Sequence, residues 1–308
     1  MKRIVMFALL ALMFALSSRA GDAPKRQGWS GPALHGDVTS VVVTELADDG
    51  SEKVSKYKFN KRGDVSEVYV RNNNGAFVPS MKYSYNEAGQ KVYEVYYRAN
   101  GTSGKQVYYL YNTAGKRLRE AEYNMSGKLL SRVFYTYKEG RVVEMIVHDF
   151  VDNNKDSYPY EYDSIGRLTV EMECSYHLDG VGSIIYNGYK YDSNGNKISL
   201  ESYICNDMEG YPTNISYQHD DKGRVVEEAM VVAPYGFYQK KSVYKYDDQG
   251  KLIEEKIVEE GRLVEGTKNT LRRYKYDSFG NEIEVVEYRN GEEWSGRTAK
   301  STLITYRN

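Results

Sequence analysis

The chain has 308 residues, 28% of them charged, and its formal net charge is −1. Neither sign of charge forms a long run, so the sequence lacks the basic surface on which nucleic-acid binding depends. Thirty-one residues are tyrosine, whose apolar ring and polar hydroxyl suit thin, partly solvated sheets better than a thick apolar core.

The first twenty residues have the pattern of a secretory signal peptide. Lys2 and Arg3 precede an uninterrupted apolar stretch at residues 4–16, and Ser18 and Ala20 supply the small residues of a cleavage site. The alternative is a membrane anchor, but this stretch is short for a hydrocarbon core of about 30 Å. We therefore expect export to the periplasm or the cell exterior, with a mature net charge of about −4 because the removed residues are basic.

Residues 21–36 lack any alternation of polar and apolar side chains and contain Pro24 and Pro32. They are predicted to form an extended leader. Within it, Trp29 is expected to cap the first hairpin of the domain that follows.

Residues 37–308 form one domain of tandem repeats, about nine units of about 26 residues each. Each unit contains two aromatic residues, usually tyrosines, at alternate positions, which is typical of a β-strand. Asp or Asn usually follows and favours a type I turn, and a glycine accepts the left-handed conformation that ends it. Each unit therefore predicts an antiparallel β-hairpin with a glycine bulge. The turn glycines are Gly63, Gly89, Gly115, Gly140, Gly166, Gly195, Gly223, Gly250 and Gly280.

The unit at residues 160–168 shows the expected register most clearly. Tyr162 is predicted to face Leu168, and Tyr160 to face Val170, so that all four side chains share one face. Other units place apolar residues on both faces or delay the apolar position by one residue. Bulges and a sheet with two apolar faces both remain open as explanations.

Two strands per unit give roughly eighteen strands, and open twisted sheets seldom exceed about ten. We expect an all-β fold in which the sheet is extended and curled, as a spiral or solenoid-like stack. An outer-membrane barrel is the alternative, although Lys and Glu interrupt the apolar stripes that would face lipid. Ile304 and Tyr306 predict the first strand of a tenth, incomplete unit.

The second turn of each unit varies in length and chemistry, which reflects either drift or a recognition surface on a regular scaffold. The expected ligand contacts are aromatic residues of these loops, namely Trp294, Tyr211, Phe237 and Tyr235. The tyrosine pairs would bind sugar rings or peptides if their face is open, and would serve as core if it is filled.

One variable loop has the alternate spacing of a calcium-binding loop, in Asp152, Asn154 and Asp156. Ser157 stands where such a loop needs glycine, so an ordinary polar turn is favoured and no metal or other cofactor is expected. An oxidising compartment permits a disulfide between Cys174 and Cys205. Their strand parities place them on opposite faces unless a bulge intervenes, so this pairing is not favoured.

The segments YEYDSIGRL, KYDSNGNKI, KYDDQGKLI and KYDSFGNEI resemble the YD repeats of RHS-type proteins. The resemblance implies a spiral β-shell around a toxin domain, or a carbohydrate-binding structure at the cell surface. It also extends to small exported bacterial families with such repeats and no known function. The unit here is longer than the usual repeat, and neither an RHS core signature nor a toxin domain is evident.

These features favour an exported, non-enzymatic β-repeat scaffold that binds a carbohydrate or a protein, with no nucleic-acid partner and no membrane span after signal cleavage. One alternative is a shell-like component of an RHS-type toxin system. Another is an unrecognised hydrolase, for which His148, His177 and carboxylates would have to meet in a cleft. The sequence contains no catalytic motif, so no catalytic residue is assigned.

Overall fold

The computed structural model describes residues 26–177, 180–205, 212–232, 238–262, 264, 266–289 and 292–307. These residues form twenty β-strands, and every strand pairing is antiparallel. Among the described residues no helix has the length and hydropathy needed to cross a membrane. The strands are β1 (Val38–Leu46), β2 (Glu52–Phe59), β3 (Val65–Arg71), β4 (Phe77–Tyr85), β5 (Lys91–Tyr97), β6 (Ser103–Tyr111), β7 (Arg117–Asn124), β8 (Leu129–Lys138), β9 (Arg141–Asp149), β10 (Asn154–Tyr162), β11 (Leu168–His177), β12 (Gly180–Tyr191), β13 (Lys197–Cys205), β14 (Thr213–His219), β15 (Val225–Val232), β16 (Tyr238–Tyr246), β17 (Leu252–Gly261), β18 (Lys268–Tyr276), β19 (Glu282–Arg289) and β20 (Glu292–Tyr306).

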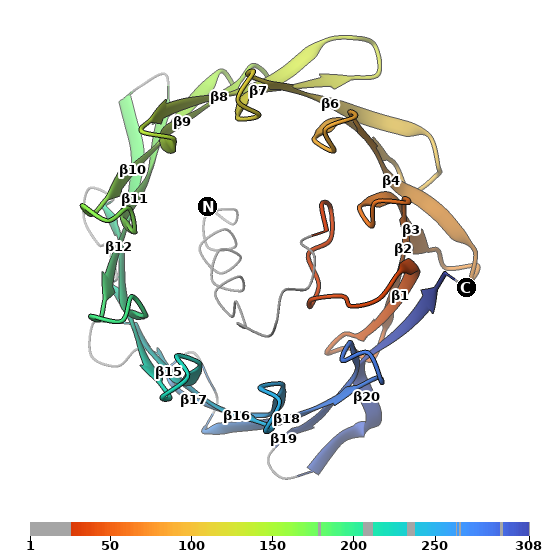
Figure 1. Cartoon of the computed structure of the whole chain (residues 1–308), viewed down its shortest axis with the longest axis vertical. Helices are drawn as coiled ribbons and strands as arrows, with labels where there is room; N and C mark the ends of the chain where they lie inside the picture. Colours follow the sequence, from red (N-terminus) through yellow and green to blue (C-terminus); the bar gives the residue numbers. More distant parts are fainter. Residues whose placement is uncertain are drawn as a thin grey trace.

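The sheet closes into a barrel, so the expected extended or spiral sheet is wrong. Each strand pairs with the next along the chain, and β20 pairs with both β19 and β1. Figure 1 shows the resulting ring, with the C-terminal strand beside the first one. Closure gives both terminal strands a second partner and so removes the two edges that an open sheet would expose.

The last and first strands together form a tenth hairpin, which confirms the predicted tenth unit and completes it. Tyr306 faces Val38, and the register shifts by one residue directly beyond this pair, as it does at each of the other tight turns. The backbone N–H of Arg307 donates to the carbonyl of Asp37 at 2.8 Å. The equivalent bond closes the covalent turns elsewhere, so two distant segments of the chain reproduce the repeat.

The turn after β10 shows why each repeat needs its Asp and its glycine. The N–H of Asp163 donates to the carbonyl of Arg167 at 2.9 Å, and the Asp163 carboxylate accepts from the Arg167 N–H at 2.8 Å. Between them, Gly166 has a φ of 89°, in the left-handed region that favours glycine. The predicted hairpin with a glycine bulge is confirmed here.

The bulge resolves the register that the sequence left open. Tyr162 faces Leu168 as predicted, but Tyr160 faces Glu171 and not Val170. The extra residue of the bulge shifts the rest of β11 by one position. Glu171, and not its apolar neighbour, therefore shares the face of the tyrosines.

The tyrosine face lines the inside of the barrel. Described leader residues, from Arg26 onward, lie within the ring (Figure 1), and Trp29 packs edge-on against Tyr57 at 4.9 Å and Phe59 at 5.9 Å between ring centroids. Trp29 thus covers the first hairpin, as the sequence suggested. Because directly paired residues share a face, the register carries this orientation around the wall. The inward tyrosine pairs are Tyr83 and Tyr85, Tyr109 and Tyr111, Tyr135 and Tyr137, Tyr160 and Tyr162, Tyr189 and Tyr191, Tyr244 and Tyr246, and Tyr274 and Tyr276.

The second tyrosine of a pair links its hairpin to the preceding one. Its hydroxyl donates to the backbone carbonyl two residues after the preceding turn glycine, as Tyr111 does to Lys91 at 2.7 Å. We call this hydrogen bond the hairpin clamp. The other clamps are made by Tyr85, Tyr137, Tyr162, Tyr191, Tyr246 and Tyr276.

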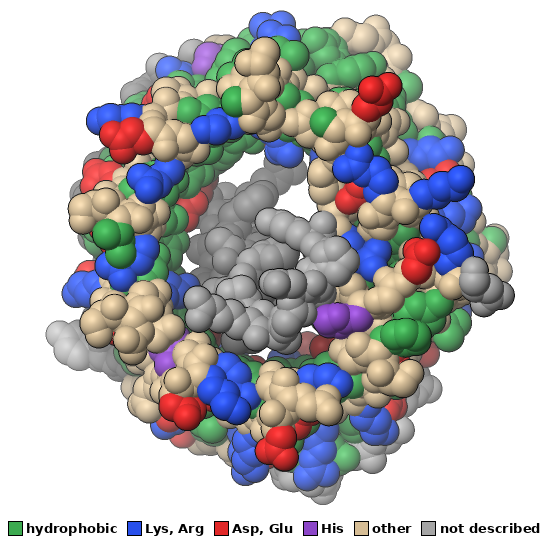
Figure 2. Space-filling view, viewed as in Figure 1, with side chains coloured by type: hydrophobic (Ala, Val, Ile, Leu, Met, Phe, Trp, Pro, Cys, Tyr) green, Lys and Arg blue, Asp and Glu red, His purple; other side chains and the backbone are tan. Residues whose placement is uncertain are grey.

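Cations reinforce the clamps along the rim that carries the tight turns. The basic residue after a turn glycine lies over the clamp tyrosine of the next hairpin, as Arg224 does over Tyr246 at 4.6 Å. Similar contacts join Lys116 to Tyr137, Arg141 to Tyr162, Arg167 to Tyr191 and Lys251 to Tyr276. Figure 2 shows Lys and Arg side chains spaced around the rim.

The two cysteines are not bridged. Cys174 is a free, buried thiol on β11. The register places the backbone of both Cys174 and Cys205 opposite Ile184 of β12, because the bulge between Lys190 and Tyr191 removes the opposite parity that an unbulged hairpin would give. One strand lies between them, which separates their Cα atoms by roughly 9.6 Å, beyond the limit of about 7 Å for a disulfide.

Candidate functional site

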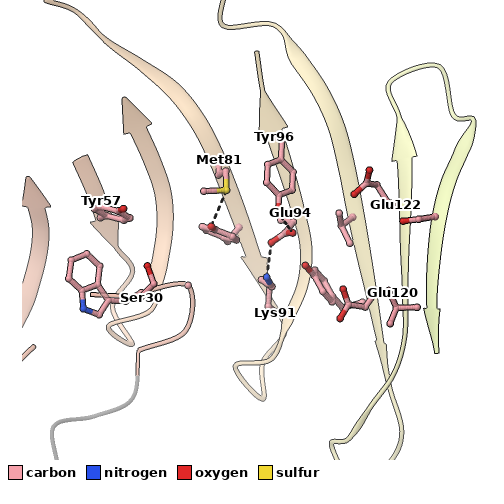
Figure 3. Close-up of a pocket in the computed structure, with 15 residues that line it drawn as sticks. Ser30, Tyr57, Met81, Lys91, Glu94, Tyr96, Glu120 and Glu122 are labelled. Carbon is pink, nitrogen blue, oxygen red and sulfur yellow. Dashed lines mark hydrogen bonds and ion pairs between the residues drawn. The ribbon is translucent and has the colours of Figure 1, made fainter. Parts of the chain in front are cut away.

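A cavity of about 720 Å³ lies inside the barrel, between the leader and the wall from β2 to β8. Trp29 and Ser30 of the leader form one side, and strand residues form the other (Figure 3). We call this space the lumenal cleft. Its aromatic lining residues are Trp29, Tyr57, Tyr83, Tyr96 and Tyr109, and its acidic lining residues are Glu94, Glu120 and Glu122.

Backbone and side-chain hydrogen bonds hold the leader in place beside the cleft. The N–H of Gln27 donates to Asp64 Oδ1 at 3.0 Å, and its carbonyl accepts from the N–H of Val65 at 2.9 Å. Its side-chain amide donates to the carbonyl of Gly89 at 2.5 Å. These bonds to two neighbouring tight turns fix the position of Trp29, two residues further on.

Each acidic group of the cleft is paired with a cation. The distances are 2.6 Å for Lys91–Glu94, 2.8 Å for Arg117–Glu120 and 2.9 Å for Lys105–Glu122. In β5 and in β7 the bulge after the turn glycine places the cation and the glutamate on the same face, whereas Lys105 reaches Glu122 from the neighbouring strand β6. The cleft thus presents carboxylate oxygens as acceptors with little net charge.

Glu94 is the most deeply buried of these acids, with 3% of its surface exposed. It accepts hydrogen bonds from Lys91 Nζ at 2.6 Å and from Tyr96 Oη at 2.8 Å. Burial raises its pKa, but hydrogen bonds from Lys91 and Tyr109 outweigh burial, so the pKa lies below its ordinary value. Glu94 is therefore ionised at neutral pH.

The cleft tyrosines remain protonated at neutral pH. Burial, reinforced by the charges of Glu94 and Tyr57, raises the pKa of Tyr83 to about 12. Burial and the hydrogen bond to Glu94 raise the pKa of Tyr109 further. Tyrosine hydroxyl donors and carboxylate acceptors thus lie side by side along the wall, next to aromatic rings.

The structure does not test the aromatic residues that the sequence predicted from the variable loops. Tyr211, Tyr235 and Phe237 lie outside the described residues, as does the side chain of Trp294 in β20. Only the backbone placement of Trp294, near the variable-loop end of β20, is described.

The weak calcium candidate is divided between a turn and a strand. Asp152 lies in the turn before β10, Asn154 begins that strand, and Asp156 accepts a hydrogen bond from Ser175 Oγ at 2.6 Å. In the described part of the chain, no three His, Cys, Asp or Glu residues are grouped so that they could hold a metal ion.

A hydrolase would need His148 to meet carboxylates in a cleft, but His148 does not face the lumenal cleft. Its register with Arg132 places it on the outer face of β9, where its ring packs 5.8 Å from Phe134 and 6.2 Å from Phe150. The wall separates it from the acids of the cleft. The side chain of His177 lies outside the described residues.

Sequence reasoning missed the glutamates of the cleft. Glu94 and Glu120 each stand five residues after a turn glycine, and Glu171, Glu228 and Glu255 repeat this spacing. Read with a bulge at each turn, the spacing would have placed all five on the tyrosine face. Trp29 had no comparable signal, because its contact with the cleft depends on the path of the leader.

No family model matches this chain, and no curated protein sequence matches it. Among solved structures, one similar protein is the TcdB2-TccC3-Cdc42 crystal structure, with 13% identity and a TM-score of 0.44 over 84% of this chain and 15% of that one. Another is the Photorhabdus luminescens Tc holotoxin pore, with 14% identity and a TM-score of 0.39 over 86% of this chain and 17% of that one. This chain thus spans only a small part of both toxin chains.

A third similar structure is a porin-like protein from Bacteroides uniformis ATCC 8492, with 10% identity and a TM-score of 0.40 over 88% of this chain and 98% of that one. These values are too low to carry an argument about function. Any function must be argued from the lumenal cleft itself.

Proposed function

We propose that the protein is an exported, non-enzymatic scaffold whose lumenal cleft binds a neutral carbohydrate. The observation that carries this proposal is the combination of Trp29, four tyrosines and three ion-paired glutamates around one cavity. Aromatic rings offer apolar surface to the C–H groups of sugars, and carboxylates accept hydrogen bonds from hydroxyl groups. Because the carboxylates are already paired with cations, a neutral ligand is favoured over a charged one.

The protonation of the cleft supports binding without cleavage. A glycosidase needs one carboxylic acid that stays protonated to donate to the leaving oxygen. The pKa of Glu94 lies below its ordinary value because Lys91 and the tyrosines stabilise the ionised form. Glu94 thus suits the role of a permanent acceptor better than that of a proton donor.

The outer face supports a place in water, in the periplasm or at the cell exterior. Glu67 is paired across neighbouring strands with Lys58 at 3.0 Å and Lys82 at 3.1 Å. On the other side of the ring, Glu254 is paired with Lys245 at 2.8 Å. A lipid-facing wall would carry apolar side chains at such outward positions. This agrees with the export that the pattern of the first twenty residues predicts.

The proposal is tested by screening the mature protein on a glycan array and measuring any hit by calorimetry. We expect binding of a neutral oligosaccharide, with affinity at least tenfold lower in Trp29→Ala. Tyr108→Ala is the matched control, because Tyr108 is an aromatic residue on the outer face with 46% of its surface exposed. Absence of binding to every neutral glycan, or equal loss in both variants, would rule the proposal out.

A second candidate is a shell-like component of an RHS-type toxin system. The observation favouring it is that the closed wall encloses part of its own chain, the described leader residues (Figure 1). A neighbouring gene for a toxin or an immunity protein would support this candidate. An isolated gene would count against it.

A further inference from the structure

We infer that the leader is a clasp that keeps the tenth hairpin closed, and that this hairpin is the point where the barrel opens to exchange a strand with a second copy of the chain. The inference does not depend on the proposed function. It concerns the seam, which we define as the pairing of β20 with β1.

The seam differs from every other tight hairpin in its connection. Elsewhere a short turn, such as residues 163–167, joins the two strands and keeps them at high effective concentration. At the seam the strands come from opposite ends of the repeat domain, and only non-covalent contacts hold them together. Seven residue pairs, from Val38–Tyr306 to Glu45–Lys300, form this contact.

Asn281 is the first anchor of the clasp. It lies in the turn between β18 and β19 and has 0% of its surface exposed. Its Oδ1 accepts from the N–H of His35 at 2.6 Å, and its Nδ2 donates to the carbonyl of His35 at 3.1 Å and to Tyr306 Oη at 2.6 Å. One buried amide thus joins the leader and strand β20 to the neighbouring hairpin.

Arg26 is the second anchor, on the other side of the seam. Its guanidinium donates to the carbonyl of Gly36 at 2.7 Å, to that of Leu34 at 3.4 Å and to that of Gly63 at 3.2 Å. Gly63 belongs to the turn between β2 and β3, so Arg26 ties the end of the leader to the first covalent hairpin. The leader therefore spans the seam from one flanking turn to the other.

Apolar packing lies between the two anchors. Leu34, Val38 and Val41 are almost fully buried in one cluster, and Ile304 and Tyr306 pack against it. This cluster contains residues from the leader and from both strands of the seam. Loss of the leader would expose it and weaken the one pairing that has no covalent turn.

A second copy of the chain is the partner that fits an opened seam. Opening exposes one edge of β1 and one edge of β20, and exposed strand edges pair with other strands. The β20 edge of one copy matches the β1 edge of another in the register already seen within one chain. Such an exchange reproduces the same contacts between molecules, which is domain swapping.

The test compares strand exchange in Asn281→Ala with that in Asn196→Ala. Asn196 has the same place in its turn and its side-chain amide donates to Asp192 at 2.9 Å. No hydrogen bond joins it to the leader residues that the structure describes, 26–36. Two preparations with different tags are mixed, and mixed dimers are counted by native mass spectrometry after size separation. We expect mixed dimers to form at least tenfold faster in Asn281→Ala than in wild type, and at the wild-type rate in Asn196→Ala.

A seam lock checks that exchange occurs at this place. Val42 and Leu303 face each other across the seam, at a Cα separation of about 5 Å that allows a disulfide. Val42→Cys/Leu303→Cys is expected to abolish mixed dimers when oxidised and to restore them when reduced. Equal exchange in the two asparagine variants, or exchange that persists in the oxidised lock, would overturn the inference.

Amide hydrogen exchange of the wild-type protein keeps the test decisive if Asn281→Ala fails to fold. The seam strands β1 and β20 are expected to lose protection together and at least tenfold faster than β7 and β8, which a covalent turn and clamps hold on both sides. Equal protection of these two strand pairs would refute the claim that the barrel opens at the seam.

Discussion

Replacing Tyr111 by phenylalanine removes one hydroxyl group and leaves the aromatic ring in place. The lost group donates to the carbonyl of Lys91 at 2.7 Å and joins β6 to the preceding hairpin. No other contact of the ring is expected to change, because the two side chains have the same shape. The variant therefore isolates the hydrogen bond of a single clamp.

The expected cost follows from the geometry of that bond. A net contribution of about 1 kcal/mol is typical, and a partly buried carbonyl left without its partner raises the cost toward about 2 kcal/mol. We expect the free energy of unfolding to fall by about 1–2 kcal/mol in Tyr111→Phe. Tyr191 and Tyr276 clamp distant hairpins and have different acceptors, so a triple variant should lose roughly three times as much.

Urea denaturation followed by circular dichroism measures this change. The midpoint should decrease while the denaturant slope stays constant, because the surface exposed on unfolding is unchanged. Tyr108→Phe is the control, because the Tyr108 hydroxyl lies on the outer face and makes one long hydrogen bond, of 3.4 Å, to Gln106. We expect its free energy of unfolding to fall by less than about 0.5 kcal/mol. A Tyr111→Phe variant as stable as this control would refute the clamp.

Two further predictions concern the same tyrosine face. His219 occupies the place of a clamp tyrosine in β14, so His219→Tyr is expected to reach the carbonyl of Lys197 and to raise the free energy of unfolding by about 1 kcal/mol; no gain in the urea midpoint would contradict this. Burial raises the pKa of Tyr83 and Tyr160 to about 12 in the folded protein. Because the folded form holds these protons more tightly than the unfolded form, their contribution to stability should be constant below about pH 10 and fall between pH 10 and 12. Absorbance at 295 nm follows ionisation, and thermal unfolding follows stability. Ionisation of all the tyrosines near pH 10 without unfolding would contradict the burial of this pair.

Strands and turns were predictable wherever their conformation depends on residues close together in the sequence. The order Tyr, Asp, Gly predicts strand, turn and bulge because the conformation of each depends on near neighbours, and the turn at Asp163–Gly166 agrees. The tenth unit was predictable for the same reason, since Ile304 and Tyr306 repeat the spacing of earlier strands. The register beyond the bulge was not, because one extra residue exchanges Val170 for Glu171 on the inner face.

Closure of the barrel and the candidate site depend on information that is not local. A spiral and a ring can be built from the same hairpin repeat. They differ only by a small rotation between successive hairpins, and the pattern of residues does not indicate the size of this rotation. The pairing of β20 with β1 decides between them. Similarly, His35 and Asn281 meet although 246 positions separate them, and the leader brings Trp29 to the cleft only because of such contacts.

The joining of the first strand to the last one has a consequence for biosynthesis. When β1 has formed, one of its edges must wait for β20 until the rest of the array is in place. The intermediate hairpins can form in order as they appear, since each pairs with its predecessor. The ring itself is a late, long-range event, and until it closes the unpaired edge of β1 is exposed to pairing with strands of other chains.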